Sequence, residues 1–120
     1  MTATMALAVA LGGAVGAVGR YLAGRWLPPR RQIPWGTLLV NVAGSFLLGL
    51  VLGAGLSPWW TALVGTGFCG ALTTFSTFSS ELVHQLERRA WLAFGAYAVG
   101  SILLGLAACW AGLALVAAGG

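Results

Sequence analysis

Four long apolar runs, separated by short polar connections, dominate the sequence. They cover residues 3–26, 35–56, 59–82 and 91–118. An α-helix rises 1.5 Å per residue, so about 22 residues span roughly 33 Å, which is enough to cross the hydrocarbon core of a bilayer. The pattern therefore predicts an all-α integral membrane protein with four transmembrane helices, in a single domain over residues 1–120.

The connections contain residues that end helices. The first connection includes Pro28, Pro29 and Pro34, and the second is Ser57-Pro58. Proline removes a backbone donor and restricts the residue before it, so no helix is expected to continue through these sites. The third connection is expected over Val83–Arg89, where polar and charged side chains replace the apolar run. Almost no chain remains for a domain outside the membrane.

Composition agrees with this class. The chain is 59% hydrophobic and 7% charged, with a mean hydropathy of +0.93, whereas soluble domains carry roughly 25% charged residues. The net charge of +4 reflects six arginines, which lie at the edges of apolar runs, and two glutamates. That pattern suggests topology signals and contacts with membrane lipid rather than nucleic-acid binding. No nucleophile–base pair or metal-ligand cluster is visible, so an enzyme is not expected.

One polar stretch interrupts the third apolar run. From Gly65 to Glu81 the sequence reads GTGFCGALTTFSTFSSE, with glycines first and then a dense series of hydroxyls. Glycine and β-branched threonine both weaken a helix. Freed backbone groups at membrane depth are tolerated only where they are buried or line a cavity. We predict a mid-membrane break near Gly70–Thr73 whose carbonyls hold a small monovalent cation.

Phe75 and Phe78 follow the predicted break, on nearly the same helix face. Ordinary apolar packing is one interpretation. The other is that their ring edges, which carry positive partial charge, face an anion together with hydroxyl donors such as Ser76 and Thr77. A path without fixed positive charge would let the anion bind weakly enough to leave.

Polar residues in the second and fourth runs also have two interpretations. Asn41 is either an interhelical clamp or a donor whose amide N–H groups point at an anion. Tyr97 and Ser101, one turn apart, belong either to a stripe that packs against another helix or to a path that passes an ion between hydroxyls.

The first run carries a stripe of residues at four-residue intervals, namely Gly12, Gly16, Arg20 and Gly24. Gly12-x-x-x-Gly16 is a small-residue pattern that lets another helix backbone approach closely. Arg20 either meets a partner or a watery cavity, or extends toward the nearby headgroups.

Three motifs together resemble the Fluc-type fluoride channels of the CrcB family. They are GGAVGAVGRY at residues 12–21, GTLLVNVAGSF at 36–46 and GFCGALTTFSTF at 67–78, in the family's order. With the fourth helix they account for nearly the whole chain, and the third motif is the most specific. The resemblance implies a fluoride-selective channel that exports cytoplasmic fluoride passively across a bacterial inner membrane and confers fluoride resistance.

The resemblance also implies an assembly and its site residues. Two antiparallel subunits would form a dual-topology dimer with two fluoride pores and a central structural Na⁺, to which each subunit contributes carbonyls of Gly70 and Thr73. Phe75 and Phe78 would form a phenylalanine box, with Asn41 as the amide beside the pore. The other matching positions are Ser76, Thr77, Tyr97 and Ser101 near a polar track, Arg20 near a vestibule, and Glu81, the acid after the phenylalanines.

The arginines favour one orientation in the membrane. Four spans place the first and third connections on one side, and these carry Arg25, Arg30, Arg31, Arg88 and Arg89. The termini and the second connection carry no basic side chain. The positive-inside rule then places both termini outside. Because a homodimer with both orientations requires little bias, the partner is either a second copy or an oppositely oriented homologue in a heterodimer.

Two other functions suit a four-helix protein of this length. A small multidrug-type, proton-coupled exporter needs a carboxylate inside the membrane, and the first run has none. Glu81 could serve as a coupling carboxylate, or it is an interfacial residue near His84 and Arg88. A structural membrane subunit would explain the glycine faces but not Asn41 or the hydroxyl-rich stretch. The exporter is kept as the alternative function.

Overall fold

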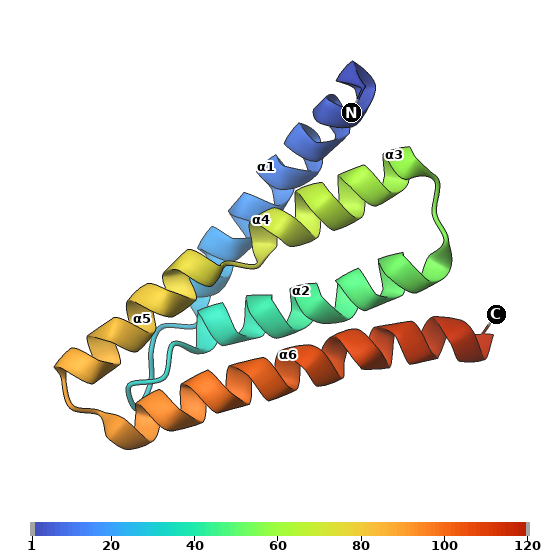
Figure 1. The fold of residues 1–120 in the computed structure, drawn as a ribbon. Helices are drawn as coiled ribbons and strands as arrows, with labels where there is room; N and C mark the ends of the chain where they lie inside the picture. The colour runs from blue at the N-terminus through green and yellow to red at the C-terminus, as the bar shows by residue number, and fades with distance from the viewer. Residues whose placement is uncertain (1, 120) are drawn as a thin grey trace.

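The computed structural model describes residues 2–119, which form helical segments and no strand (Figure 1). The long helices are α1 (Ala3–Trp26), α2 (Trp35–Ala54), α5 (Phe75–Glu87) and α6 (Trp91–Gly119). Three short segments lie between α2 and α5, namely α3 (Pro58–Trp60), the π-helix η1 (Thr61–Cys69) and α4 (Gly70–Leu72).

Within the described residues, α1, α2 and α6 are each long and apolar enough to cross a membrane. The predicted third span is instead divided into α3, η1, α4 and α5, with Thr73 and Thr74 outside any helix. The interruption expected near Gly70–Thr73 therefore falls at Thr73–Thr74. The helices and the three apolar spans agree with the predicted all-α, multi-pass membrane protein.

Two predicted boundaries differ from the structure. The second helix ends at Ala54 rather than near residue 56, because Gly55 adopts a left-handed conformation with φ of 64°. The prediction that Val83–Arg89 forms a connection is wrong, since α5 continues to Glu87. The helix extends past Leu82 because it buries Phe78 and, two turns later, Gln85 while it packs against α6.

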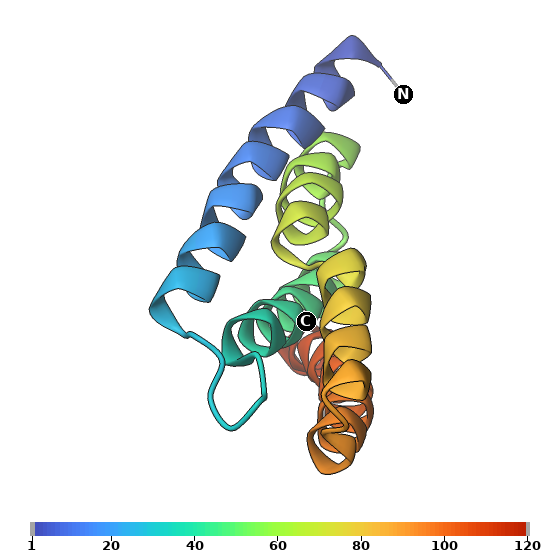
Figure 2. The same ribbon diagram turned by 90° about the vertical axis from the view of Figure 1, so that its left-hand side faces the viewer.

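The helices pack in two pairs. α1 lies along η1, and α2 lies along α6 (Figure 2). A Cβ added at Gly12 would collide with the backbone carbonyl of Leu63, and one at Gly49 would collide with the carbonyl of Cys109. The close approach predicted from the glycines of the first helix is thus confirmed, with η1 as the partner.

The break is also where the chain changes partner. α4 contacts α1, whereas α5 contacts α6 (Figures 1 and 2). A straight helix could not follow both neighbours, because they diverge at this level (Figure 2). The two non-helical threonines redirect the chain from one pair of helices to the other.

η1 was not predicted from the sequence. The N–H of Gly70 donates to the carbonyl of Gly65, five residues earlier, which is the bond of a π-helix. Such segments are rare and usually one turn long, and they occur often at functional sites. Here the wider winding directly precedes the break.

Candidate functional site

The site begins with the two threonines that end one helix and start the next. Thr73 and Thr74 have extended backbones, with ψ of 155° and 124°. The Thr73 hydroxyl donates to the carbonyl of Cys69, the last residue of η1, at 2.8 Å, and the Thr73 backbone N–H donates to the same carbonyl at 3.0 Å. The Thr74 hydroxyl accepts from the N–H of Thr77 at 3.2 Å and caps α5. The second threonine of the break therefore stabilises the start of the next helix.

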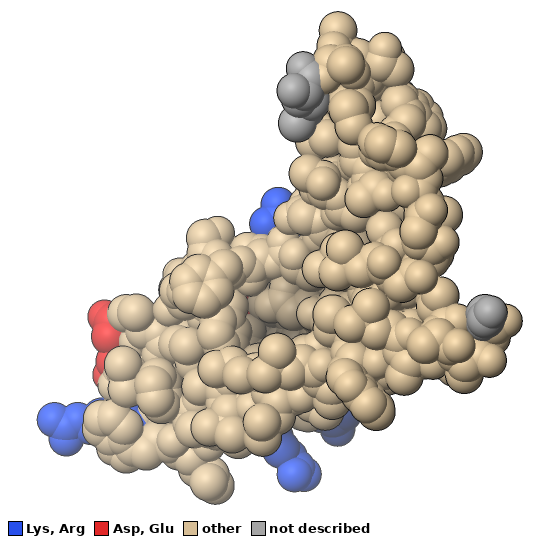
Figure 3. Space-filling view, turned by 45° about the vertical axis from the view of Figure 1, so that its right-hand side comes forward, with Lys and Arg blue, Asp and Glu red and all other residues tan. Residues whose placement is uncertain are grey.

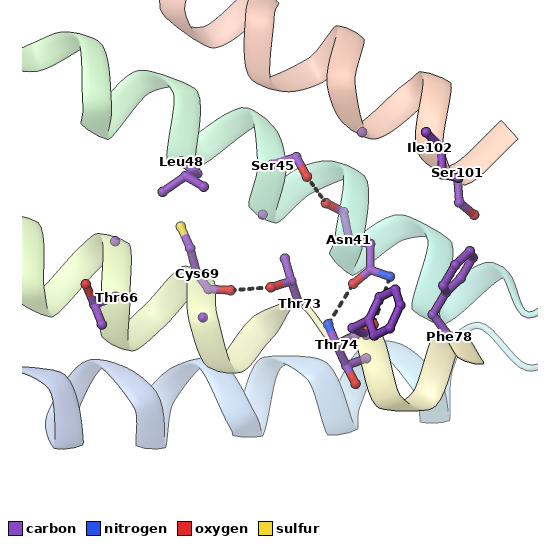
Figure 4. Close-up of a pocket in the computed structure, with 15 residues that line it drawn as sticks. Asn41, Ser45, Leu48, Thr66, Cys69, Thr73, Thr74, Phe78, Ser101 and Ile102 are labelled. Atoms are coloured by element: carbon purple, nitrogen blue, oxygen red, sulfur yellow. Dashed lines mark hydrogen bonds between the residues drawn. The ribbon is translucent and has the colours of Figure 1, made fainter. Parts of the chain in front are cut away.

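Asn41 of α2 holds the break in place. Its Oδ1 accepts from the N–H of Thr74 at 2.8 Å, and its Nδ2 donates to the carbonyl of Thr74 at 3.3 Å (Figure 4). One side-chain amide thus satisfies both backbone groups of a buried, non-helical residue. Of the two interpretations of Asn41, the clamp is the one that these bonds support. Nδ2 carries a second hydrogen, so a further donor remains on the same amide.

The same bonds change the partners of two backbone carbonyls. In an unbroken α-helix the N–H of Thr74 would donate to the carbonyl of Gly70, and that of Thr77 to the carbonyl of Thr73. These N–H groups donate instead to Asn41 Oδ1 and Thr74 Oγ1. The carbonyls of Gly70 and Thr73 therefore lose their helical donors. These are the two carbonyls that the sequence analysis assigned to a cation.

A cavity of about 620 Å³ lies beside the break (Figure 4). Its walls come from α2, η1, α4, α5 and α6, and it brings together six of the predicted site residues, namely Asn41, Gly70, Thr73, Phe75, Phe78 and Ser101. Four other predicted residues, Arg20, Ser76, Thr77 and Tyr97, do not line it. The remaining lining is mostly small or apolar, so the few polar groups are the ones available to a solute.

The two phenylalanines of α5 differ in environment. Phe78 is 8% exposed and lies between Phe75 and Tyr97, with ring centroids 6.1 Å and 5.1 Å away. Phe75 is 80% exposed, although it lines the same cavity. Phe78 is thus part of the subunit's own core, while Phe75 lies at the open edge of the cavity.

Glu81 lies in a second polar cluster, one turn along α5 from Phe78. Its carboxylate accepts from the Tyr97 hydroxyl at 2.7 Å and from the Thr37 hydroxyl at 3.1 Å. The sequence suggested His84 and Arg88 as neighbours of Glu81, but its hydrogen bonds go to Thr37 and Tyr97. The cluster joins α2, α5 and α6, and the ring of Tyr97 packs against the buried ring of Phe78.

The remaining predicted residues lie around these two clusters. The Ser76 hydroxyl is 3.3 Å from that of Thr74. Ser101 lines the cavity, and its buried hydroxyl has no hydrogen-bond partner in the structure. The predicted pairing of Tyr97 with Ser101 is not a hydrogen bond, because the Tyr97 hydroxyl donates to Glu81. Arg20 is half-buried on α1.

Sequence reasoning missed Thr37 and Gln85. Thr37 lies one helical turn before Asn41, so the shared face was a usable signal. Gln85 is 3% exposed, and its Nε2 donates to the backbone carbonyl of Gln32 at 2.8 Å. It was overlooked because Val83–Arg89 was expected to be an exposed connection.

Fold and site define a class: a small helical membrane protein with one interrupted span, whose break presents carbonyls, hydroxyls and phenyl rings to one cavity. Within residues 2–119 no group of three or more His, Cys, Asp or Glu side chains could hold a metal.

Comparison with known proteins gives the family. The family described as "CrcB-like protein, Camphor Resistance (CrcB)" matches residues 7–113. The chain is 54% identical over 109 residues to fluoride-specific ion channel FluC 2 of Rhodococcus jostii, covering 91% of this chain and 96% of the relative. It is 51% identical over 113 residues to fluoride-specific ion channel FluC of Bordetella petrii, covering 90% and 88%. The FluC protein of Thermococcus kodakarensis is 42% identical over 120 residues, covering 96% and 98%. The chain belongs to the CrcB family.

Proposed function

We propose that the protein is a fluoride-selective ion channel, not an enzyme, through which fluoride leaves the cytoplasm passively and which thereby confers fluoride resistance. The observation that carries the proposal is the Thr73–Thr74 break, held open by Asn41 beside a cavity that Phe75 and Phe78 line. The proposal is supported by family membership, because this chain belongs to the CrcB family and its relatives are named fluoride-specific ion channels.

The proposed path uses groups that do not carry a fixed charge. The buried Ser101 hydroxyl lacks a partner, and Asn41 Nδ2 retains one free hydrogen, so both can donate to a small anion. Edges of the Phe75 and Phe78 rings add positive partial charge. Ser76, Thr77 and Tyr97 lie farther along α5 and α6, and Arg20 would act at a vestibule. Weak, successive contacts of this kind allow rapid passage.

A structural Na⁺ fits the carbonyls of Gly70 and Thr73. Both have lost their helical donors, and a Cβ built at Gly70 meets no atom within 4 Å, so the chain leaves this face open. Two carbonyls from one chain are too few for the ion. Two copies that meet at this face would supply four, which ties the ion to an antiparallel dimer. Sedimentation in detergent can measure the fraction of dimer in Na⁺ and in K⁺. Loss of the dimer when K⁺ replaces Na⁺ would support this assignment.

The partner is a second copy or an oppositely oriented homologue. Phe75 is largely exposed at the mouth of an open cavity, so one subunit alone does not enclose a path. The first and third connections, which carry the arginines, lie at one end of the molecule (Figure 1). Cysteine-accessibility mapping of the two termini in a bacterial inner membrane distinguishes the cases. Labelling from one side only supports the heterodimer, and equal labelling from both sides supports the homodimer.

Fluoride efflux from proteoliposomes, followed with a fluoride-selective electrode, tests the function. Fast efflux of fluoride with retention of chloride is expected. The multidrug-type exporter predicts proton-coupled transport of organic cations instead, and the same vesicles can be assayed for it. Correctly folded protein that releases no fluoride would remove the channel assignment.

A further inference from the structure

A second cavity, of about 590 Å³, lies where α1 ends and α2 begins. It is lined by Trp26, Leu27, Pro28, Pro29, Arg30, Arg31 and Trp35. None of these residues lines the cavity beside Asn41, so the two cavities have separate walls. Two arginines and two tryptophans around one space form a mixed cationic and aromatic surface that the proposed channel does not use.

The backbone beneath the two arginines is a tight turn. Arg30 and Ile33 exchange two backbone hydrogen bonds, of 3.0 Å and 3.1 Å. Arg31 and Gln32 between them have φ of 54° and 65°. Positive φ at both central residues is the pattern of a type I′ turn, which favours Asn-Gly. Arg31 and Gln32 both carry a Cβ, so the turn has backbone strain that glycine would avoid. Strain of this kind often marks a functional segment.

Two side chains anchor this turn from outside. The indole Nε1 of Trp35 donates to the carbonyl of Arg30 at 3.2 Å. The buried Gln85 of α5 donates to the carbonyl of Gln32 at 2.8 Å. The turn is thus fixed to both α2 and α5, and Arg30 and Arg31 extend from a preorganised backbone.

The charge at this end of the molecule is not balanced by the protein. The last turn of α1 and the first and third connections together carry five arginines, whereas the whole chain has two acidic residues, Glu81 and Glu87. The carboxylate of Glu81 already accepts from Tyr97 and Thr37. Figure 3 shows blue basic side chains projecting from the lower part of the surface, some beside the red acidic side chains and others apart from them. The excess positive charge at this end therefore favours an external anion.

The two tryptophans indicate where this cavity lies relative to the bilayer. Trp26 is 70% exposed and Trp35 is 42% exposed. Exposed tryptophans at the ends of transmembrane helices lie at the headgroup level of a bilayer. Apolar surface continues from them into the membrane, with Val18 of α1 and Leu39 of α2 both exposed. A ligand here would have a phosphate at the turn and acyl chains beside the two helices.

We propose that this surface is a binding site for an anionic phospholipid, with Arg30 and Arg31 holding the headgroup phosphate. Arginine pairs with phosphate through two parallel hydrogen bonds, and basic pockets between transmembrane helices bind anionic headgroups. The site does not rest on the proposed channel activity. A bound anionic lipid would also hold this face of the protein in the leaflet where such lipids are enriched.

The test uses the full-length protein in detergent and native mass spectrometry with added phosphatidylglycerol or phosphatidylcholine. Wild-type protein should retain phosphatidylglycerol preferentially. Arg30→Gln/Arg31→Gln should weaken its binding roughly 30-fold, about fivefold for each arginine. The matched control is Arg88→Gln/Arg89→Gln, which removes the same charge at the same end but lines no part of this cavity. The control should retain most of the binding.

Further arms distinguish the alternatives. Arg30→Lys/Arg31→Lys keeps the charge and the fold, and should bind between the wild type and the glutamine variant. Glycerophosphoglycerol, a headgroup without acyl chains, and inorganic phosphate should not displace the lipid. Displacement by either would show a phosphate site rather than a lipid site and overturn the proposal. Equal losses in the two glutamine variants, or no loss in the first, would also overturn it.

Discussion

Asn41 completes both backbone hydrogen bonds of Thr74, although the two residues lie 33 positions apart on different helices. The pairing lets the third span leave its helical path inside the membrane without an unsatisfied backbone group at that residue. It also withdraws the N–H that would otherwise bond to the carbonyl of Gly70. One amide therefore maintains the break and exposes a possible cation ligand.

Asn41→Ala should lower both stability and fluoride efflux. The variant leaves the N–H and the carbonyl of Thr74 without partners in a buried position, at a cost of about 1–3 kcal/mol. Thermal unfolding in detergent measures the first effect and proteoliposome efflux the second. Ser45→Ala is the control for stability, because the hydrogen bond it removes, of 2.7 Å from the Ser45 hydroxyl to the carbonyl of Asn41, lies within α2 and not at the break. An Asn41→Ala protein with wild-type stability would show that the clamp does not hold the break.

The two phenylalanines should separate folding from conduction. Phe78 is buried, so Phe78→Ala should destabilise the protein by about 3 kcal/mol or more as well as reduce efflux. Phe75 is 80% exposed in the subunit, so Phe75→Ala should reduce efflux while stability changes by only about 0.5 kcal/mol. Circular dichroism on heating and fluoride efflux give the two readouts. Unchanged efflux in Phe75→Ala would remove that ring from the path.

Tyr97→Phe should destabilise the cluster around Glu81 and leave the packing with Phe78 intact. The variant removes the hydroxyl that donates to the carboxylate at 2.7 Å, and a hydrogen bond to a charged group contributes about 1.5–3 kcal/mol. The other tyrosine offers the control, since Tyr21 is 64% exposed and Tyr21→Phe should unfold like the wild type. Equal unfolding temperatures for both variants would contradict the importance of this bond.

Glycines of α1 provide a packing test. An alanine at position 12 would place its Cβ against the backbone of Leu63, so Gly12→Ala should destabilise the protein by about 1–3 kcal/mol. Gly24 lies on the same helix with no atom within 4 Å of an added Cβ. Gly24→Ala should be neutral or stabilising by up to about 1 kcal/mol, because alanine favours the helix. The reverse order of stabilities would place the α1–η1 contact elsewhere.

Much of the fold follows from sequence patterns. Apolar runs bounded by prolines or by charged residues located α1, α2 and α6. The glycine and threonine content located the break to within a residue or two. The end of the third span was misjudged because Gln85 and Glu81 read as exposed charged or polar residues, although both engage partners on other segments. Hydropathy alone cannot reveal a polar side chain whose partner is distant in sequence.

The site was less accessible to prediction. The residue type of Asn41 was equally compatible with a clamp and with an anion donor. The clamp is seen only in its two bonds to Thr74, and these bonds do not use the second Nδ2 hydrogen that the proposed anion path requires. The π-helical winding of η1 has no sequence signature comparable to a proline or a glycine cap. The η1 backbone packs closely against the glycines of α1, and such contacts exist only in the folded protein.

Measuring fluoride and chloride efflux side by side tests whether the protein is a fluoride-selective channel. Purified wild-type protein is reconstituted into vesicles that contain both fluoride and chloride, with a K⁺ ionophore to balance charge, and each anion is followed with its own electrode. We expect rapid loss of fluoride while chloride stays inside, with the fluoride rate sharply reduced in Asn41→Ala and unchanged in Tyr21→Phe. Equal release of both anions, or retention of fluoride by folded wild-type protein, would contradict it.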